Sequence, residues 1–300
     1  MAETGQDTPM GIERFITIDG VRTRYFSEGD GPPILFLHGG NFGSAGGAST
    51  ARIWEPVFNH LRAGFNPISL DRLGQGYTGN PLRDEDYTMD AVVQHVAGFV
   101  RALGKGPCHL VGHSRGGYIV ARLALEHPDV ARTITIVSSG TLSPGVLRNH
   151  IQLAHPPKPL LTRESQRWVY ERYSYNHTIV TEDWLDETVA VAATEKNAIA
   201  VRKMASEGLE KRLFLPELAR QRMESQRWIL ERGIPCPTLV AWGWNDPTAD
   251  PVNGRLLIEM LMQKQRDTEV RFFNRAGHFV FREHPRAFAL MLQHYVAQHA

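Results

Sequence analysis

Short apolar runs that alternate with helical patterns are the feature of this 300-residue chain that most restricts its fold. The first half holds four runs, at residues 33–37, 66–70, 108–111 and 132–137. Strands buried on both faces lose the polar–apolar alternation of a half-exposed strand, and PILFL at residues 33–37 is such a segment. Because strands separated by helices are usually connected in parallel, the pattern predicts an α/β fold.

Two more strands are expected before these runs and two after them. Residues 15–19 and 21–27 alternate like a hairpin, with Asp19 and Gly20 as the turn. Residues 238–242 and 269–273 resume the strand pattern near the end of the chain. We therefore expect a mostly parallel sheet of eight strands, flanked by helices at residues 54–62, 89–103, 117–127, 252–264 and 285–299.

The middle of the chain, from residue 143 to residue 231, contains helical patterns only. They lie at residues 163–173, 181–194, 198–206 and 215–230. Pro156, Pro157 and Pro159 mark a break in the chain before them. We therefore predict one core of residues 13–142 and 232–298, with residues 143–231 inserted as a helical lid.

Charge and composition exclude several classes of function. The chain has 33 basic and 32 acidic residues, whereas a nucleic-acid-binding protein needs a basic surplus. Its two cysteines are too few for a disulfide framework. The sequence shows neither a signal peptide nor an apolar run of the ~18 residues that span a membrane. We expect a cytoplasmic protein without nucleic-acid or membrane partners.

The sequence Gly112-His113-Ser114-Arg115-Gly116 matches the G-x-S-x-G pattern, in which a serine stands on a tight turn between a strand and a helix. The apolar run CHLV precedes the pattern and the helical segment YIVARLALEH follows it, so the required context is present. Flanking glycines let the backbone turn without side-chain clashes. Ser114 is therefore the predicted nucleophile.

A serine hydroxyl needs a base, and the base needs a carboxylate partner. His278 follows the last expected strand, and Asp246 follows the strand before it, with Asp250 as the near alternative. The carboxyl ends of parallel strands lie at one edge of a sheet, so these residues are expected to meet Ser114 there. The sequence thus predicts a triad of Ser114, Asp246 and His278.

The oxyanion that forms during acyl transfer needs preorganised N–H donors. The backbone N–H of Arg115 lies at a helix N-terminus, where such donors are unpaired. A second donor is expected from the loop His38-Gly39-Gly40-Asn41, most simply the N–H of Gly40. The sequence therefore predicts an oxyanion hole formed by Gly40 and Arg115.

Several motifs together resemble the α/β-hydrolase fold family across nearly the whole chain. They are the HGG loop, DRLGQG after residues 66–70, GHSRGG, GWND and AGH, with serine, aspartate and histidine in that family's order. Within the family, the chain is similar to the meta-cleavage-product hydrolases through HGGNFGSAGGAS, the position of the lid and the spacing from Gly243 to Asp246. The resemblance implies hydrolysis of a carbon–carbon bond next to a ketone in a dienoate acid. We expect no cofactor and no metal ion, and the resemblance allows a homodimer.

Three residues depart from the pattern of the meta-cleavage-product hydrolases. His113 stands where they usually have Asn, Arg115 where they have a small or apolar residue, and Phe279 where they have Trp. That subfamily also holds the substrate carboxylate with a lid arginine, for which Arg167 and Arg172 are available here. Two alternatives therefore stay open: a carboxylesterase or lactonase, and a cofactor-free oxygenase or lyase on the same fold.

Aromatic side chains are frequent in the lid and near the predicted triad, which favours an apolar or aromatic small-molecule substrate. The competing expectation for each of them is packing between lid and core. The residues expected to line the pocket are Asn41, His113, Trp168, Tyr173, Trp244 and Phe279.

Overall fold

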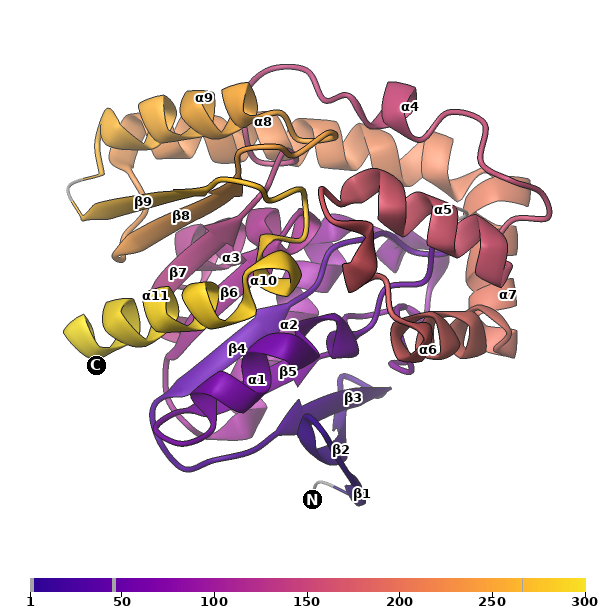
Figure 1. Ribbon diagram of the computed structural model, residues 1–300, viewed down its shortest axis with the longest axis horizontal. Helices are drawn as coiled ribbons and strands as arrows, with labels where there is room; N and C mark the ends of the chain where they lie inside the picture. The colour runs from indigo at the N-terminus through magenta and orange to yellow at the C-terminus, as the bar shows by residue number, and fades with distance from the viewer. Residues whose placement is uncertain (1–2, 45–46, 266) are drawn as a thin grey trace.

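The computed structural model describes residues 3–44, 47–265 and 267–300, and in them nine strands form one sheet (Figure 1). The strands are β1 (Glu3–Thr8), β2 (Gly11–Ile18), β3 (Val21–Ser27), β4 (Pro33–Leu37), β5 (Asn66–Leu70), β6 (Cys108–His113), β7 (Ala131–Val137), β8 (Thr238–Gly243) and β9 (Thr268–Phe273). Their spatial order is β1-β2-β3-β5-β4-β6-β7-β8-β9. The pairs from β1 to β5 are antiparallel, and those from β5 through β4 to β9 are parallel.

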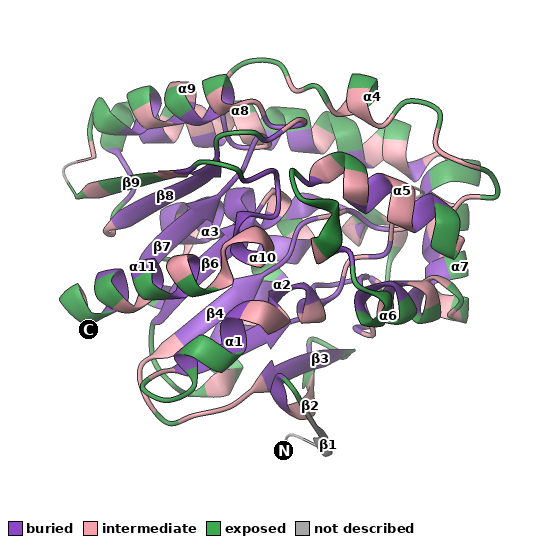
Figure 2. Ribbon diagram, in the orientation of Figure 1, coloured by how far each residue is buried: buried purple, intermediate pink, exposed green. Residues whose placement is uncertain are grey.

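Helices cover both faces of this sheet (Figure 1). One face packs against α1 (Glu55–Leu61), α10 (Val280–Glu283) and α11 (Pro285–Gln298), and the other against α2 (Met89–Leu103), α3 (Arg115–Glu126) and α9 (Pro251–Met262). The strands from β4 to β8 are almost entirely buried between these layers (Figure 2). Burial on both faces explains why their sequences are so rich in apolar residues.

The chain between β7 and β8 leaves the sheet, and its described elements are helical. They are α4 (Asn149–Gln152), α5 (Arg163–Tyr173), α6 (Glu182–Ala192), α7 (Glu195–Val201) and α8 (Leu215–Arg232), with short helical turns at His177–Ile179, Arg202–Ser206 and Glu210–Phe214. We call residues 143–231 the lid segment, and its boundaries stay a prediction. No helix in the described part of the chain is long and apolar enough to cross a membrane.

The sheet has one strand more than the sequence predicted. The additional strand, β1, is formed by the polar segment ETGQDT and pairs only with β2 at the edge of the sheet. An edge strand is held by backbone hydrogen bonds and needs no apolar sequence. Apolar patterning therefore gave no signal for it.

Candidate active site

Ser114 stands at the turn between β6 and α3, in a backbone conformation that is rare for a residue with a side chain. Its φ is 55° and its ψ is −118°. Backbone hydrogen bonds hold the turn: Ser114 N–H donates to Val137 O at 2.8 Å, and Gly117 N–H donates to Ser114 O at 3.0 Å. Such a conformation costs about 1–3 kcal/mol, persists only where the surroundings enforce it, and is typical of functional sites.

Gly112 and Gly116 make this turn sterically possible. A Cβ on Gly112 would collide with the carbonyl oxygen of Gly116, and a Cβ on Gly116 would collide with that of Leu37 in β4. Helix α3 therefore starts in close contact with β4 and β6, and Ser114 lies at the carboxyl end of β6. This is the strand–turn–helix context that the G-x-S-x-G pattern requires.

His278 and Asp246 are joined by a buried hydrogen bond. The distance from His278 Nδ1 to Asp246 Oδ2 is 2.7 Å, and each residue is 4% exposed. The other carboxylate oxygen accepts from Thr248 N and Oγ1 at 2.9 Å and from Ala249 N at 2.8 Å. Asp250 instead accepts from a backbone N–H at the start of α9. The carboxylate beside His278 is thus Asp246, and its orientation is fixed.

Two buried side chains hold the loop of residues 39–41, for which the sequence predicts an oxyanion donor. Arg72 Nη2 donates to Gly39 O at 2.6 Å and to Gly40 O at 3.0 Å. Gln75 Nε2 donates to Asn41 O at 2.9 Å, while its Oε1 accepts from Arg72. The carbonyl groups of residues 39, 40 and 41 therefore all accept hydrogen bonds from Arg72 or Gln75. Burial, the largest cause, lowers the pKa of Arg72 to about 9, so the guanidinium is still charged at neutral pH.

Sequence reasoning quoted DRLGQG only as a family motif and missed this support of the loop. Both side chains belong to that motif, so the signal was present. What the pattern does not reveal is that Arg72 is fully buried without a carboxylate partner among the described residues. Its hydrogen bonds to neutral carbonyl groups depend on where two loops meet in space.

His113, directly before Ser114, is buried against His278. His113 Nε2 lies 3.0 Å from His278 O, and the two ring centroids are 4.5 Å apart. The His113 ring also packs against Phe279 and Phe281, with centroids at 5.4 and 5.0 Å. Burial, as the largest cause, lowers the pKa of His113 well below its ordinary 6.5. The His113 ring is therefore uncharged at neutral pH, and it packs against the loop that carries His278.

The loop that carries His278 is bound to the residues that follow α5 in the lid segment. Glu283 accepts hydrogen bonds from Tyr175 N at 2.6 Å and Asn176 N at 2.9 Å, and also from Gly277 N. Burial raises the pKa of Glu283, and these N–H donors oppose the rise. One carboxylate thus joins the lid segment to the loop of the predicted base.

A cavity of about 120 Å³ lies between Ser114 and the lid segment. Its walls are Gly39, Gly40, Ser44, Gly47, Ser49, Ile53, His113, Ser114, Leu153, Val169, Tyr170, Tyr173, His278 and Phe279. The structure thus brings Ser114 and His278 to one cavity, together with three of the predicted pocket residues, His113, Tyr173 and Phe279. Ligand pockets typically measure ~300–1,000 Å³, so a larger substrate has to widen this space.

The other three predicted pocket residues lie elsewhere. Trp244 is 48% exposed. Its ring packs against that of Phe272 in the edge strand β9, with the ring centroids 5.5 Å apart. Trp168 is only partly buried, and the guanidinium of Arg172 lies 5.0 Å from its ring. Asn41 serves its own loop, where its Oδ1 accepts from the next backbone N–H at 2.9 Å. Aromatic or amide character alone did not reveal which way each side chain points.

Sequence reasoning missed Val169, which forms part of the cavity wall on the apolar face of α5. Val169 and Tyr170 are buried there, and the Tyr170 hydroxyl donates to Ala48 O at 3.2 Å. Val169 precedes the predicted pocket residue Tyr173 by four positions, which places the two on one face of a helix. That spacing was the signal that could have found Val169.

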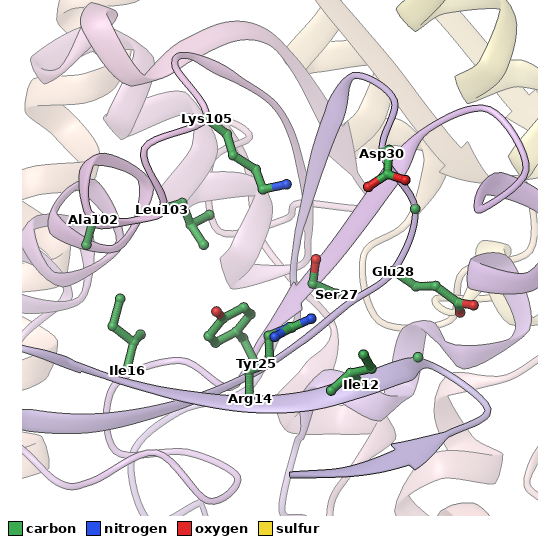
Figure 3. A pocket seen from close by; sticks show the side chains of 12 residues that line it. Ile12, Arg14, Ile16, Tyr25, Ser27, Glu28, Asp30, Ala102, Leu103 and Lys105 are labelled. Carbon is green, nitrogen blue, oxygen red and sulfur yellow. The ribbon is translucent and has the colours of Figure 1, made fainter. Parts of the chain in front are cut away.

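A larger cavity, of about 650 Å³, lies at the opposite edge of the sheet (Figure 3). It is bounded by Asp30, which precedes β4, and Lys105, which precedes β6, whereas Ser114 follows β6. Figure 3 shows Arg14 and Tyr25 beside it. It shares no lining residue with the cavity at Ser114. Size alone therefore does not identify the site.

Comparison with known proteins decides the family. The model of the alpha/beta hydrolase family matches residues 34–289, a range that includes Ser114, Asp246 and His278. The chain belongs to the alpha/beta hydrolase family. The fold and the enzyme class predicted from the motifs are thereby confirmed.

Relatives within the alpha/beta hydrolase family extend over most of the chain. It is 26% identical over 284 residues to the 2-hydroxy-6-oxo-6-(2'-aminophenyl)hexa-2,4-dienoic acid hydrolase of Metapseudomonas resinovorans. This match covers 93% of the present chain and 88% of that enzyme. It is 24% identical to the 2-hydroxymuconate semialdehyde hydrolase of Pseudomonas sp. (strain CF600), with 96% and 94% covered. The solved 2-hydroxy-6-oxo-6-phenylhexa-2,4-dienoate hydrolase of Rhodococcus sp. strain RHA1 has the same fold, with a TM-score of 0.74, 18% identity and coverage of 99% and 100%. The predicted resemblance to meta-cleavage-product hydrolases is confirmed.

Proposed function

We propose that this protein hydrolyses a carbon–carbon bond next to a ketone in an acidic dienoate, with Ser114 as nucleophile. The observation that carries the proposal is the buried Asp246–His278 hydrogen bond at a cavity that Ser114 also lines. The relatives support the substrate class, because those described above are hydrolases of a hexadienoic acid and of a muconate semialdehyde.

Acylation follows from the arrangement of these groups. His278 Nδ1–H donates a hydrogen bond to Asp246 Oδ2, so His278 Nε2 is the nitrogen that takes up a proton. Ser114 Oγ adds to the ketone carbon as its proton moves to that nitrogen. The backbone N–H groups of Gly40 and Arg115 stabilise the negative charge that forms on the ketone oxygen.

The carbon–carbon bond then breaks, and the acyl group stays on Ser114. This bond can break because the dienol ketonises beforehand: the proton of its 2-hydroxyl group is lost and the carbon next to the ketone gains one, which makes that carbon saturated. The departing carbon carries the electron pair, which the remaining enone delocalises as a dienolate, and the dienolate takes the proton from His278 Nε2. Water gives a proton to His278 and adds to the acyl carbon, which releases a carboxylic acid and restores the Ser114 hydroxyl. The same groups would cleave an ester, whose leaving group needs no delocalisation.

The experiment that tests this function compares two substrates. We expect kcat/KM on 2-hydroxy-6-oxo-6-phenylhexa-2,4-dienoate to exceed that on p-nitrophenyl butyrate by at least about 100-fold, because only the first has a delocalised carbon leaving group. The first reaction is followed by loss of dienoate absorbance, and the second by nitrophenolate release. A higher kcat/KM on the ester would assign the protein to the carboxylesterases instead.

A further inference from the structure

The cavity of about 650 Å³ at the opposite edge of the sheet from Ser114 has no role in the proposed reaction. It lies between the strands β2 and β3, the loop that follows β3, and the end of α2 (Figure 3). None of its described lining residues belongs to the lid segment. Ligand pockets typically measure ~300–1,000 Å³, so the volume of this cavity is that of a small-molecule site.

Part of the cavity wall is apolar. Alternate residues of a strand point to the same face of a sheet, so Ile12 and Ile16 of β2 both line the cavity. Leu103, at the end of α2, adds a third aliphatic side chain. All three side chains are only partly buried by the protein. Apolar surface is therefore left for a ligand to remove from water.

Tyr25 of β3 lines the cavity with a hydroxyl group that has no partner among the described residues. The residue is only 5% exposed, and its ring packs against that of Phe99 in α2 with the centroids 5.1 Å apart. Burial, the largest cause, raises the pKa of Tyr25, so the hydroxyl keeps its proton at neutral pH. The hydroxyl of a buried tyrosine usually finds a hydrogen-bond partner. An unpartnered one at a cavity indicates a bound acceptor.

Two cations at the cavity lack an acidic partner. Arg14 of β2 and Lys105, which follows α2, form no ion pair in the part of the chain that the structure describes. Figure 3 shows the charged ends of both side chains extending into the space that the labelled residues surround. Arg14 is also close enough to Tyr25 to oppose the rise in the pKa of its hydroxyl. Two cations and a hydroxyl donor are groups that bind an anion.

The carboxylates at the cavity do not cancel these charges. Glu28 forms an ion pair with Arg62 at 3.2 Å, and Figure 3 shows its side chain directed away from Arg14 and Lys105. Asp30, on the loop after β3, has no ion pair within the described ranges. The unpaired charges of the described lining are thus two positive and one negative. The balance favours an anionic ligand over a cationic one.

We propose that this cavity is a second binding site, separate from Ser114, for a small carboxylate with an apolar chain. The carboxylate binds to Arg14 and Lys105 and accepts a hydrogen bond from the Tyr25 hydroxyl. The chain covers the aliphatic part of the wall. This inference does not depend on the proposed function, because the two cavities share no lining residue.

The test measures binding by isothermal titration of the unaltered protein. It compares octanoate with octanamide, which has the same chain and no charge. We expect octanoate to bind about 10–100-fold more tightly, the range of a charge-assisted hydrogen bond. Arg14→Met should weaken octanoate binding by about 10-fold, and Tyr25→Phe, which removes only the hydroxyl, by about 3–10-fold. Arg255→Met, at an exposed position of α9, is the matched control and should leave the affinity unchanged.

Each outcome decides for or against the second site. Asp30→Asn should strengthen octanoate binding, because a repelling carboxylate is removed, and weaker binding by this variant would overturn the proposal. Absence of octanoate binding overturns it, as does equal affinity for octanoate and octanamide. Equal affinity of Arg14→Met and Arg255→Met for octanoate would place the ligand elsewhere on the protein and also overturn it. If Arg14→Met does not fold, as judged by its melting temperature, Lys105→Met decides in the same way.

Discussion

The ring of Tyr173 stacks on that of His278, with centroids 4.9 Å apart and planes at 26°, and His278 N–H donates to Tyr173 O at 2.8 Å. A residue of the lid segment therefore contacts the predicted base through both its side chain and its backbone. Movement of α5 changes the support of the imidazole directly. We therefore infer that the lid segment supports the predicted base in addition to covering the cavity at Ser114.

Removing the Tyr173 ring should slow the reaction more than it weakens binding. Aromatic pairs are worth about 0.5–1.5 kcal/mol, so we expect Tyr173→Ala to lower kcat by roughly 3–10-fold through looser orientation of His278. Tyr173→Phe is the matched control, because it keeps the ring and loses only a hydroxyl that accepts from Asn149 Nδ2. Steady-state kinetics on the dienoate separate kcat from KM. Equal kcat values for the two variants would show that the stack has no catalytic role.

The partner of His278 can be tested against its neighbour in sequence. Asp246→Asn should lower kcat by about 10³–10⁴-fold, because an amide favours the wrong imidazole tautomer. Asp250→Asn should keep kcat and cost at most about 1 kcal/mol of stability, because Asp250 caps α9. The reverse ranking of the two kcat values would disprove the assignment of Asp246.

Arg72 should act on catalysis by holding the carbonyl groups of Gly39 and Gly40. Lysine keeps the charge but cannot bridge both groups and Gln75, so we expect Arg72→Lys to lower kcat/KM by about 10–100-fold. A trifluoromethyl ketone forms an oxyanion on the serine, and its affinity should fall by a similar factor. A fall in kcat/KM with unchanged affinity for the ketone would locate the effect outside the oxyanion hole.

Buried histidines should make the fold sensitive to acid. Burial, as the largest cause, lowers the pKa of His95 and of His109 to about 4, and those of His38 and His113 well below 6.5. Below pH 6.5 these histidines become protonated in the unfolded chain but stay neutral in the folded protein. Their contribution to the free energy of unfolding is therefore fully present above pH 6.5 and is lost as the pH falls toward 4.

Urea unfolding between pH 4.5 and pH 8 measures this loss. We expect His95→Gln to reduce the dependence of the unfolding free energy on pH by up to about 1.4 kcal/mol per pH unit below pH 6.5, the value for one proton. His294→Gln, at an exposed position of α11, is the control and should leave the slope unchanged. Identical slopes for His95→Gln and the unaltered protein would contradict the prediction.

Local sequence patterns predicted the framework of the site well. The run of residues 33–37 forms β4 and residues 66–70 form β5, while α2 and α5 have the predicted bounds. Buried parallel strands and amphipathic helices are recognisable because their patterns reflect burial. Strand ends then place Ser114, Asp246 and His278 at one edge of the sheet, which needs only chain order and topology.

Side-chain direction and long-range contacts were not predictable in this way. Trp244 follows the same strand as Asp246 and yet packs outward, because a side chain just past a strand end is not constrained by the sheet pattern. The stack of Tyr173 on His278 depends on how α5 docks onto the core.

The most direct test of the central claim is benzoate release from 2-hydroxy-6-oxo-6-phenylhexa-2,4-dienoate by Ser114→Ala and by the unaltered protein, measured by chromatography. If Ser114 forms the acyl intermediate, its removal should lower the rate of benzoate release by at least about 10³-fold while the substrate still binds. Benzoate release by Ser114→Ala at a rate close to that of the unaltered protein would contradict the claim. It would favour a reaction in which His278 alone acts on the substrate.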